Sequence, residues 1–212
     1  MDSQRLVAEA PVPMNYLYEP GSADGRLFLI LHGYQLSARS MLNRLQPALP
    51  AGATLVIPEG PFPVPQRTTT GYKAGYSWYF YDPASDQYLV DMETSLCLLQ
   101  KLHQHLGLGA RPLTIIGYSQ GGYLAPFAAA RLRHTQRVIG LACHFLVDEL
   151  PRPLQFRMDA IHGVQDATVD PVGAQTAHAK LVAEGVKGDF YQLEDTGHEV
   201  NEAMRAKLAQ IL

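Results

Sequence analysis

The sequence predicts an α/β fold with a mostly parallel central sheet and helices on both faces. Strand-length apolar runs alternate with helical segments along nearly the whole chain, which is the pattern of strands joined by helical crossovers. Several runs are apolar throughout, as in strands buried on both faces. Polar motifs follow the predicted strands directly, where the ligand site of such a sheet lies. No linker or repeat divides the 212 residues, so we expect one domain, 1–212.

The predicted elements follow one another in a regular order. An edge strand over 15–18 precedes a buried strand over 26–31 and a helix that begins at a Ser37 cap and ends near Ala48. A long amphipathic helix is then indicated by Leu89, Met92, Leu96, Leu99, Leu102 and Leu106, and Gly107 ends it. The remaining strands are expected at 53–57, 113–116, 137–143, 154–161 and 189–193, and the remaining helices at 123–131, 173–184 and 199–212.

The segment 58–83 shows neither a helical nor a strand period. It is rich in proline at its start and carries a dense aromatic run from Tyr72 to Tyr81. A loop of this length inside a compact domain is usually functional, and its rings favour the lining of an apolar ligand site. The alternative is that the rings only hold a long loop against the sheet.

Composition excludes several classes of protein. With 47% hydrophobic and 17% charged residues the chain is globular, and a net charge of -3 without a basic stripe argues against a nucleic-acid ligand. The first residues lack the features of a secretory signal, and every apolar run is too short to span a membrane. Cys97 and Cys143 lie in apolar contexts typical of buried thiols. We therefore expect a cytoplasmic protein without stable membrane insertion.

A glycine-bracketed serine stands at 117–122, between a predicted strand and a predicted helix. Gly117 and Gly121 leave room for an abrupt reversal of the chain, and Ser119 would take a strained, positive φ that exposes its hydroxyl. The N-terminus of the helix would favour negative charge at the same place. The alternative is a glycine-rich turn that happens to hold a serine.

A nucleophilic serine needs a base to take its proton and an acid to orient that base. His198 follows the last predicted strand, and Asp166 follows the strand before it. Ser119, Asp166 and His198 thus occur in the order serine, acid, histidine that a strand–serine–helix turn of this kind requires. We predict that these three residues are the catalytic ones.

Other titratable residues fit these roles less well. Asp148 would suit an acid placed one strand earlier, and Asp195 is more typical of a turn cap. His144 precedes the acid, and His162 is expected to have a local structural role beside Gly163. The remaining alternatives are Asp170 for the acid and, among histidines on helices where solvated side chains are usual, His103, His105, His134 and His178.

An ester carbonyl that is attacked by Ser119 develops negative charge, which two backbone amides would stabilise. One is the amide of Gln120, directly after the serine, and the other is predicted at Tyr34, where Gly33 lets the backbone come close. The ring of His32 would support this loop from beneath. Substrate contacts are predicted for Gln35, Leu36, Tyr72 and Trp78.

Four stretches resemble the carboxylesterase/phospholipase family of α/β-hydrolases, which includes acyl-protein thioesterases and small bacterial carboxylesterases. They are Leu-His-Gly at 31–33, Gly-Tyr-Ser-Gln-Gly-Gly at 117–122, His-Gly-Val-Gln-Asp-Ala-Thr-Val at 162–169 and Gly-His-Glu-Val at 197–200. The resemblance implies an α/β-hydrolase fold without a large cap domain. The sequence departs from the family at Tyr34-Gln35-Leu36 and at Phe80, which replaces an aspartate.

The residues and the resemblance together predict a serine hydrolase that cleaves carboxylic esters of short to medium acyl chains through an acyl-enzyme intermediate. We expect a small-molecule acyl ester as substrate and neither a metal nor another cofactor. The alternatives are an acyl thioesterase, a lysophospholipase, an acyl transferase to an acceptor other than water, and a non-catalytic homologue. The sequence leaves the oligomeric state open.

Overall fold

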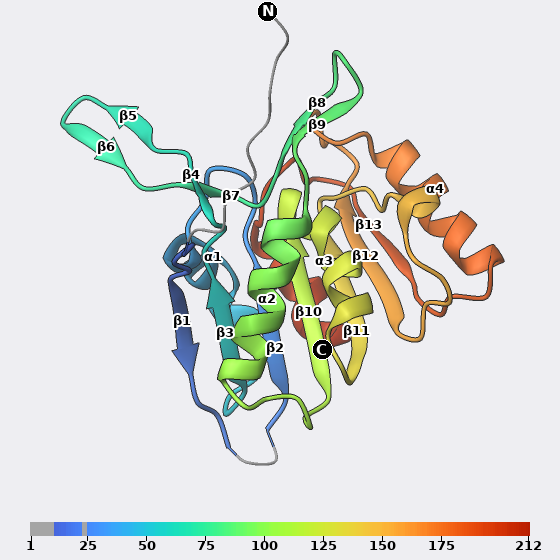
Figure 1. Cartoon of the computed structure of the whole chain (residues 1–212). Coiled ribbons are helices and arrows are strands. Elements are labelled where there is room, and N and C mark those ends of the chain that lie inside the picture. Colours follow the sequence, from blue (N-terminus) through green and yellow to red (C-terminus); the bar gives the residue numbers. More distant parts are fainter. Residues whose placement is uncertain (1–10, 23–24) are drawn as a thin grey trace, which may run out of the picture.

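In the computed structural model, residues 11–22 and 25–212 are described, and they contain a seven-stranded sheet (Figure 1). The strand order is β1-β3-β2-β10-β11-β12-β13. Only the edge strand β1 runs antiparallel to its neighbour among these described strands. The predicted α/β class is therefore confirmed. The strands are β1 (Tyr16–Glu19), β2 (Leu27–Leu31), β3 (Thr54–Pro58), β10 (Leu113–Tyr118), β11 (Thr135–Leu141), β12 (Arg157–Gly163) and β13 (Phe190–Leu193).

Helices cover both faces of this sheet. They are α1 (Ala38–Leu45), α2 (Glu93–His105), α3 (Gln120–Arg131), α4 (Pro171–Ala183) and α5 (Glu202–Ile211), with short 3-10 turns η1 (Gln46–Ala48) and η2 (Val147–Glu149). Side chains of β2 show how the two layers form. Leu27, Leu29 and Leu31 belong to the core cluster that includes residues of α2, α3 and α4, whereas Phe28 and Ile30 belong to the cluster on the opposite face, which includes residues of α1 and α5. Each such buried side chain stabilises the fold by about 1.5–3 kcal/mol.

Two helix starts show how local sequence acts. The Ser37 side chain accepts a hydrogen bond from the amide of Ser40 and caps α1, as predicted. The predicted start of the long helix near Leu89 is wrong, because α2 begins at Glu93. Leu89 belongs to β9 (Gln87–Val90), which pairs with β8 (Phe80–Asp82), and its side chain is 74% exposed.

The segment 58–83 is built of short antiparallel ladders, which corrects the prediction of an aperiodic loop. Besides β8, it contains β4 (Phe62–Pro63), β5 (Gln66–Thr68), β6 (Gly71–Lys73) and β7 (Tyr76–Ser77). β4 pairs with β7, and β5 pairs with β6 in a hairpin that projects from the body of the molecule (Figure 1). Strands of two or three residues are too short to show an alternating pattern in the sequence.

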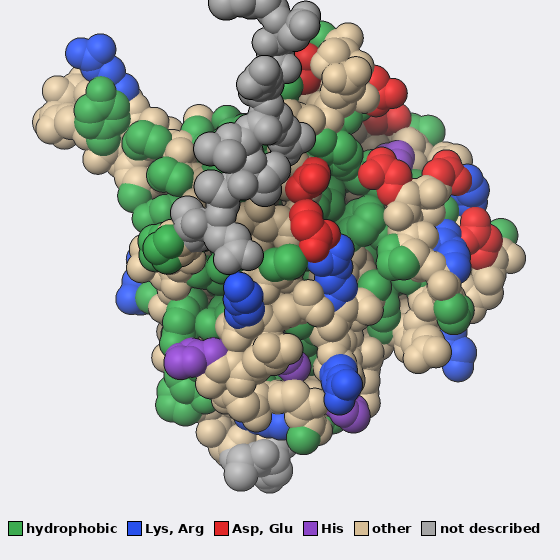
Figure 2. All heavy atoms as spheres, in the orientation of Figure 1, with side chains coloured by type: hydrophobic (Ala, Val, Ile, Leu, Met, Phe, Trp, Pro, Cys, Tyr) green, Lys and Arg blue, Asp and Glu red, His purple; other side chains and the backbone are tan. Residues whose placement is uncertain are grey.

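Acidic side chains gather on one part of the surface. Figure 2 shows Asp and Glu side chains over the β8–β9 hairpin and toward α4. Asp86, Asp148 and Glu149 are exposed residues of this region. None of the helices in the described part of the chain is long and apolar enough to cross a membrane.

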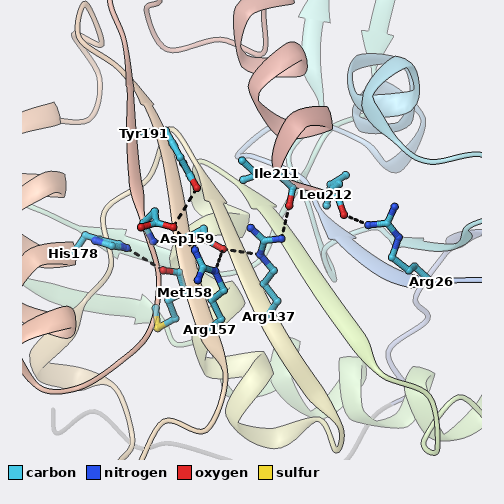
Figure 3. Close-up of polar contacts among 10 residues, drawn as sticks. Arg26, Arg137, Arg157, Met158, Asp159, His178, Tyr191, Ile211 and Leu212 are labelled. Carbon is cyan, nitrogen blue, oxygen red and sulfur yellow. Dashed lines mark hydrogen bonds and ion pairs between the residues drawn. The ribbon is translucent and has the colours of Figure 1, made fainter.

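The amino-terminal ends of the strands carry a charged network (Figure 3). The Asp159 carboxylate is fully buried and accepts hydrogen bonds from Arg137 Nε at 2.6 Å and Arg157 Nε at 2.8 Å on one oxygen. Its other oxygen accepts from the Asp189 amide at 2.8 Å and lies 2.7 Å from an Arg157 nitrogen. Arg137 also donates to the Ile211 carbonyl oxygen at 2.6 Å. The network thus ties β11, β12 and α5 together.

Candidate active site

Ser119 lies in the turn between β10 and α3, at the carboxyl end of the sheet. Its φ is 49° and its ψ is -121°, which confirms the predicted positive φ. Strain of this kind costs about 1–3 kcal/mol and persists only where the surroundings impose it. A Cβ at Gly117 would lie 2.3 Å from the Gly121 carbonyl oxygen, and one at Gly121 would lie 2.5 Å from that of Leu31. Only glycine therefore permits this close crossing of strand and helix.

The structure brings Ser119, His198 and Asp166 into contact in that order. His198 Nε2 lies 3.0 Å from Ser119 Oγ, and His198 Nδ1 lies 2.8 Å from Asp166 Oδ2. A carboxylate only accepts hydrogen bonds, so Nδ1 carries the proton and Nε2 is left to accept from the serine hydroxyl. The imidazole is thus held in the tautomer that can receive a proton from Ser119.

Asp166 is buried and anchored as a carboxylate. Its Oδ1 accepts hydrogen bonds from the amides of Thr168 and Val169, each at 2.9 Å. Burial alone would raise the pKa of Asp166, but the hydrogen bonds from Val169, His198 and Thr168 outweigh burial and lower that pKa below its usual value. Asp166 therefore remains ionised at neutral pH.

Two further residues hold these groups in place, and the sequence interpretation did not assign them to the site. Tyr118 donates its hydroxyl to the His198 carbonyl oxygen at 2.9 Å. The fully buried His162 places Nε2 3.2 Å from Asp166 Oδ2 and 3.1 Å from the Val169 carbonyl oxygen. The only signal of this contact in the sequence was the spacing of four residues between His162 and Asp166. That spacing brings the two side chains together because the chain turns after β12.

The side chain of Gln120 connects the serine turn to the segment 58–83. Its Oε1 accepts from the Trp78 amide at 3.0 Å, and its Nε2 donates to the Tyr79 carbonyl oxygen at 2.8 Å. Ser77 adds a further contact, since its hydroxyl accepts from Gln120 Nε2 at 3.0 Å. The aromatic stretch is therefore fixed against the first turn of α3.

His32 supports the neighbouring loop from within the core, as predicted. Its Nε2 accepts from the Gly60 amide at 2.9 Å, and its Nδ1 donates to the Gly33 carbonyl oxygen at 2.7 Å. Burial lowers the pKa of His32 to about 4, so the ring is neutral. Trp78 donates its indole N–H to the His32 carbonyl oxygen at 2.8 Å, and the two rings lie 4.7 Å apart.

A pocket of about 300 Å³ opens beside Ser119. Phe80 and Tyr81 come from β8, Tyr34 comes from the loop after β2, and Tyr123 comes from α3. The remaining lining residues are Tyr79, Ser119 and Gln120. Aromatic residues of the segment 58–83 thus line the pocket, although they are not the ones named from the sequence.

None of the four residues predicted to contact substrate belongs to this lining, and their contact with substrate stays a prediction. Trp78 is 0% exposed and packs in the core, while Tyr72 is 74% exposed on the projecting β5–β6 hairpin. Gln35 donates its amide to the Tyr76 carbonyl oxygen at 3.0 Å, and Leu36 forms a β-bridge with Tyr76. The three consecutive residues Tyr79, Phe80 and Tyr81 all line the pocket, so the irregular path of the chain around β8 and not a strand period decides which rings face it.

The alternative acids and bases have other partners. Asp148 pairs with Lys180 on the surface, Asp170 caps α4 by accepting from the Val172 and Gly173 amides, and Asp195 is exposed. The expectation of solvated helical histidines is wrong for His178, which is buried and contacts the Met158 carbonyl oxygen at 2.9 Å (Figure 3). His103 is half-buried, and its Nε2 is buried without a hydrogen-bond partner among the described residues, so it is not a fully solvated side chain either.

Comparisons with known proteins identify the family and the fold of this chain. The sequence model of the family described as serine hydrolase (FSH1) matches residues 24–198. No curated protein matches the chain. Among solved structures, esterase PE8 is 22% identical with a TM-score of 0.74, over 93% of this chain and 95% of that one.

Two further solved structures have similar folds. Acyl-protein thioesterase 2 of Zea mays is 17% identical with a TM-score of 0.69, over 94% of this chain and 96% of that one. A carboxylesterase from Mesorhizobium loti is 20% identical with a TM-score of 0.68, over 91% and 97%. These likenesses confirm the α/β-hydrolase fold expected from the resemblance.

Proposed function

Because the chain belongs to the serine hydrolase (FSH1) family, we propose that it cleaves carboxylic esters of short to medium acyl chains through an acyl-enzyme intermediate. The observation that carries this proposal is the continuous chain of contacts from Ser119 through His198 to Asp166. Two independent features support it. Ser119 has a strained backbone that exposes its hydroxyl, and an aromatic pocket opens beside it.

In the first half of the reaction, Ser119 Oγ attacks the ester carbonyl carbon while His198 Nε2 takes the hydroxyl proton. Asp166 orients the imidazole and stabilises its positive charge. The carbonyl oxygen becomes an oxyanion, which we assign to the backbone amides of Tyr34 and Gln120. Collapse of this intermediate breaks the bond to the leaving oxygen, which receives the proton from His198, and leaves the acyl group on Ser119.

In the second half, water attacks the acyl-enzyme. His198 Nε2 takes a proton from the water, and the new oxyanion occupies the same two amides. Its collapse returns the proton to Ser119 Oγ and releases the carboxylic acid. The lowered pKa of Asp166 keeps this residue ionised through both halves, so it acts as an orienting charge and not as a proton carrier.

Labelling by a fluorophosphonate probe tests the nucleophile directly. We expect wild-type protein to be labelled at Ser119 and the variant Ser119→Ala to remain unlabelled. His198→Ala should also lose labelling and turnover while keeping the native circular dichroism spectrum, because the ring is not part of the core. Unchanged labelling of folded Ser119→Ala would place the nucleophile elsewhere.

Matched oxygen and sulfur esters of one acyl chain then define the bond that is cleaved. We expect Ser119-dependent hydrolysis of the oxygen esters to be strongest for short to medium chains. A preference for the sulfur ester at every chain length would instead assign the site to acyl thioesters.

A further inference from the structure

We propose that the pocket beside Ser119 receives a cationic ammonium group of the substrate, which rests on aromatic rings at a rim of carboxylates. This inference rests on the proposed ester hydrolysis and names its substrate class more closely. A quaternary or primary ammonium group can belong to the acyl part or to the alcohol part of an ester. Both positions share one chemistry and are separated by the experiment below.

The first observation is the composition of the pocket wall. Five of its seven lining residues are aromatic, and none of these seven is aliphatic or positively charged. A pocket that serves only a saturated acyl chain is typically lined by aliphatic side chains as well. The rings come from three separate parts of the chain, and Tyr34 meets Phe80 edge to face, with ring centroids 6.4 Å apart. A wall of this kind binds ammonium groups through the electron-rich ring faces.

The second observation is that two tyrosines, one in the pocket wall and one that packs against it, donate their hydroxyl groups to carboxylates. Tyr81 donates its hydroxyl to Asp86, and Tyr88 donates to Glu149 Oε2 at 3.3 Å. The Tyr88 ring in turn lies 5.3 Å from that of Tyr81 and 5.9 Å from that of Tyr79. A phenol that donates to a carboxylate is more electron-rich on its ring face, which strengthens its attraction for a cation.

The third observation is the sign of the nearby charges. Burial and the Glu149 carboxylate raise the pKa of Tyr88 to about 12, so this phenol is neutral. Acidic side chains gather over this part of the surface (Figure 2). His144, which stacks on Tyr123 at 6.4 Å, adds no positive charge at neutral pH because burial lowers its pKa. The nearby field therefore favours a cation.

Two basic side chains of this part of the surface are paired with carboxylates. Lys180 contacts Asp148, and Arg152 lies 2.6 Å from Glu184. Both pairs are on the surface, where water and salt weaken their influence on the pocket. Asp86 and Glu149, in contrast, contact the hydroxyl groups of Tyr81 and Tyr88 directly.

Pairs of isosteric esters provide the test. For the alcohol side, kcat/KM is measured for choline acetate and for its neutral isostere, in which a carbon replaces the charged nitrogen. For the acyl side, the phenyl ester of trimethylammoniobutyrate is compared with its carbon isostere. Each value is divided by the rate of hydroxide-catalysed hydrolysis of the same ester, which removes differences in intrinsic reactivity. We expect the cationic member of at least one pair to be favoured by roughly 5- to 30-fold at low salt.

Variants separate the contribution of the rings from that of the carboxylates. Tyr81→Leu should lower the ratio of cationic to neutral ester by roughly 5-fold, and Glu149→Gln should lower it by about 2-fold. The matched control is Glu19→Gln, which removes an exposed carboxylate from β1 at the opposite edge of the sheet and should leave the ratio unchanged. High salt should lower the ratio in wild-type protein.

The outcomes distinguish the two proposals. If neither member of either pair is hydrolysed in a Ser119-dependent way, the proposed function itself fails. If all four esters are hydrolysed through Ser119 but the neutral isostere is equal or better in both pairs, ester hydrolysis stands and the cation site is overturned. A preference for the cationic ester that survives Tyr81→Leu and Glu149→Gln unchanged would also overturn it.

Discussion

The two ends of the central sheet carry polar clusters with opposite properties. At the amino-terminal end, the buried Asp159 is surrounded by Arg137, Arg157 and a backbone amide, so both carboxylate oxygens have partners (Figure 3). At the carboxyl-terminal end, Ser119 is held in a strained conformation, and its hydroxyl contacts His198 beside an open pocket. One cluster has its polar groups neutralised, while the other leaves a reactive group facing solvent.

This difference separates a structural use of buried charge from a chemical one. Arg137, Asp159 and Arg157 join β11, β12 and α5, and breaking the network should lower stability without changing the reaction. The Ser119 cluster keeps its strain because the crossing at Gly117 and Gly121 imposes it. Changing that cluster should abolish the reaction with little effect on stability.

The largest expected effect is on catalysis. Ser119→Ala should lower kcat/KM for an ester by at least about 10⁴-fold, because the nucleophile is lost and only binding and the oxyanion donors remain. Its melting temperature should stay close to that of wild type. Ester hydrolysis and thermal unfolding of one preparation check both parts. A folded Ser119→Ala protein that keeps a tenth of the activity would remove the contrast between the two ends.

The next effect belongs to the amino-terminal end. Asp159→Asn should lower the free energy of unfolding by about 3 kcal/mol, because two guanidinium groups lose a fully buried carboxylate. For a protein of this size, that corresponds to a fall in melting temperature of about 6–12 °C. The kcat should be unchanged at temperatures where the variant is folded.

An exposed ion pair provides the control for this loss. Asp148→Asn breaks the surface pair with Lys180, and we expect no measurable change in melting temperature. Equal falls in melting temperature for Asp159→Asn and Asp148→Asn would show that burial of the Asp159 network contributes nothing to stability. A loss of kcat in Asp159→Asn would show that the two ends are coupled.

Acid should weaken the fold through His32, which supports the site without joining the reaction. Its folded pKa of about 4 lies below the ordinary value of 6.5, so between these values the unfolded chain binds a proton that the folded chain does not. The free energy of unfolding therefore falls as the pH is lowered, by about 2 kcal/mol from pH 7 to pH 5. Urea unfolding at several pH values measures this slope. His32→Gln should flatten it, and an identical slope in the variant would assign the pH dependence to other groups.

The smallest effect concerns His162, which we place as a positioning residue for Asp166. His162→Phe removes the ring nitrogen that contacts Asp166 Oδ2, and kcat should fall about 10-fold with little change in KM. Loss of this donor should leave more negative charge on Asp166 beside His198, which favours the protonated imidazole, so the low-pH limb of kcat should move to higher pH.

The matched control is His178→Phe, which changes another buried histidine that contacts a backbone carbonyl and not the acid. It should lower the melting temperature and leave the pH profile unchanged. His162→Gln retains an N–H donor and should recover part of the activity. A normal pH profile in His162→Phe would reduce this residue to a structural role.

Much of the site could be predicted because its requirements are local. The glycines around Ser119 indicate a close crossing of strand and helix that larger residues would block. The positions of Asp166 and His198 directly after strands indicate that both lie at the same edge of the sheet. The pocket lining could not be predicted in the same way. Trp78 and Phe80 lie two residues apart in one aromatic run, yet the first is in the core and the second faces the pocket. Trp78 lies in the connection between β7 and β8, and the irregular path of that connection, which leaves no period in the sequence, decides this.

The sequence by itself determined the fold class, the strained turn at Ser119 and the order in the chain of Ser119, Asp166 and His198. These properties follow from backbone sterics and from the alternation of strands and helices, which a chain displays along its length. Only the tertiary structure decided that His162 meets Asp166, that Gln120 holds the aromatic segment and that Tyr81, bonded to Asp86, joins other rings in the pocket wall. Each of those contacts joins side chains whose facing directions depend on packing, because short strands and turns do not prescribe them in the sequence.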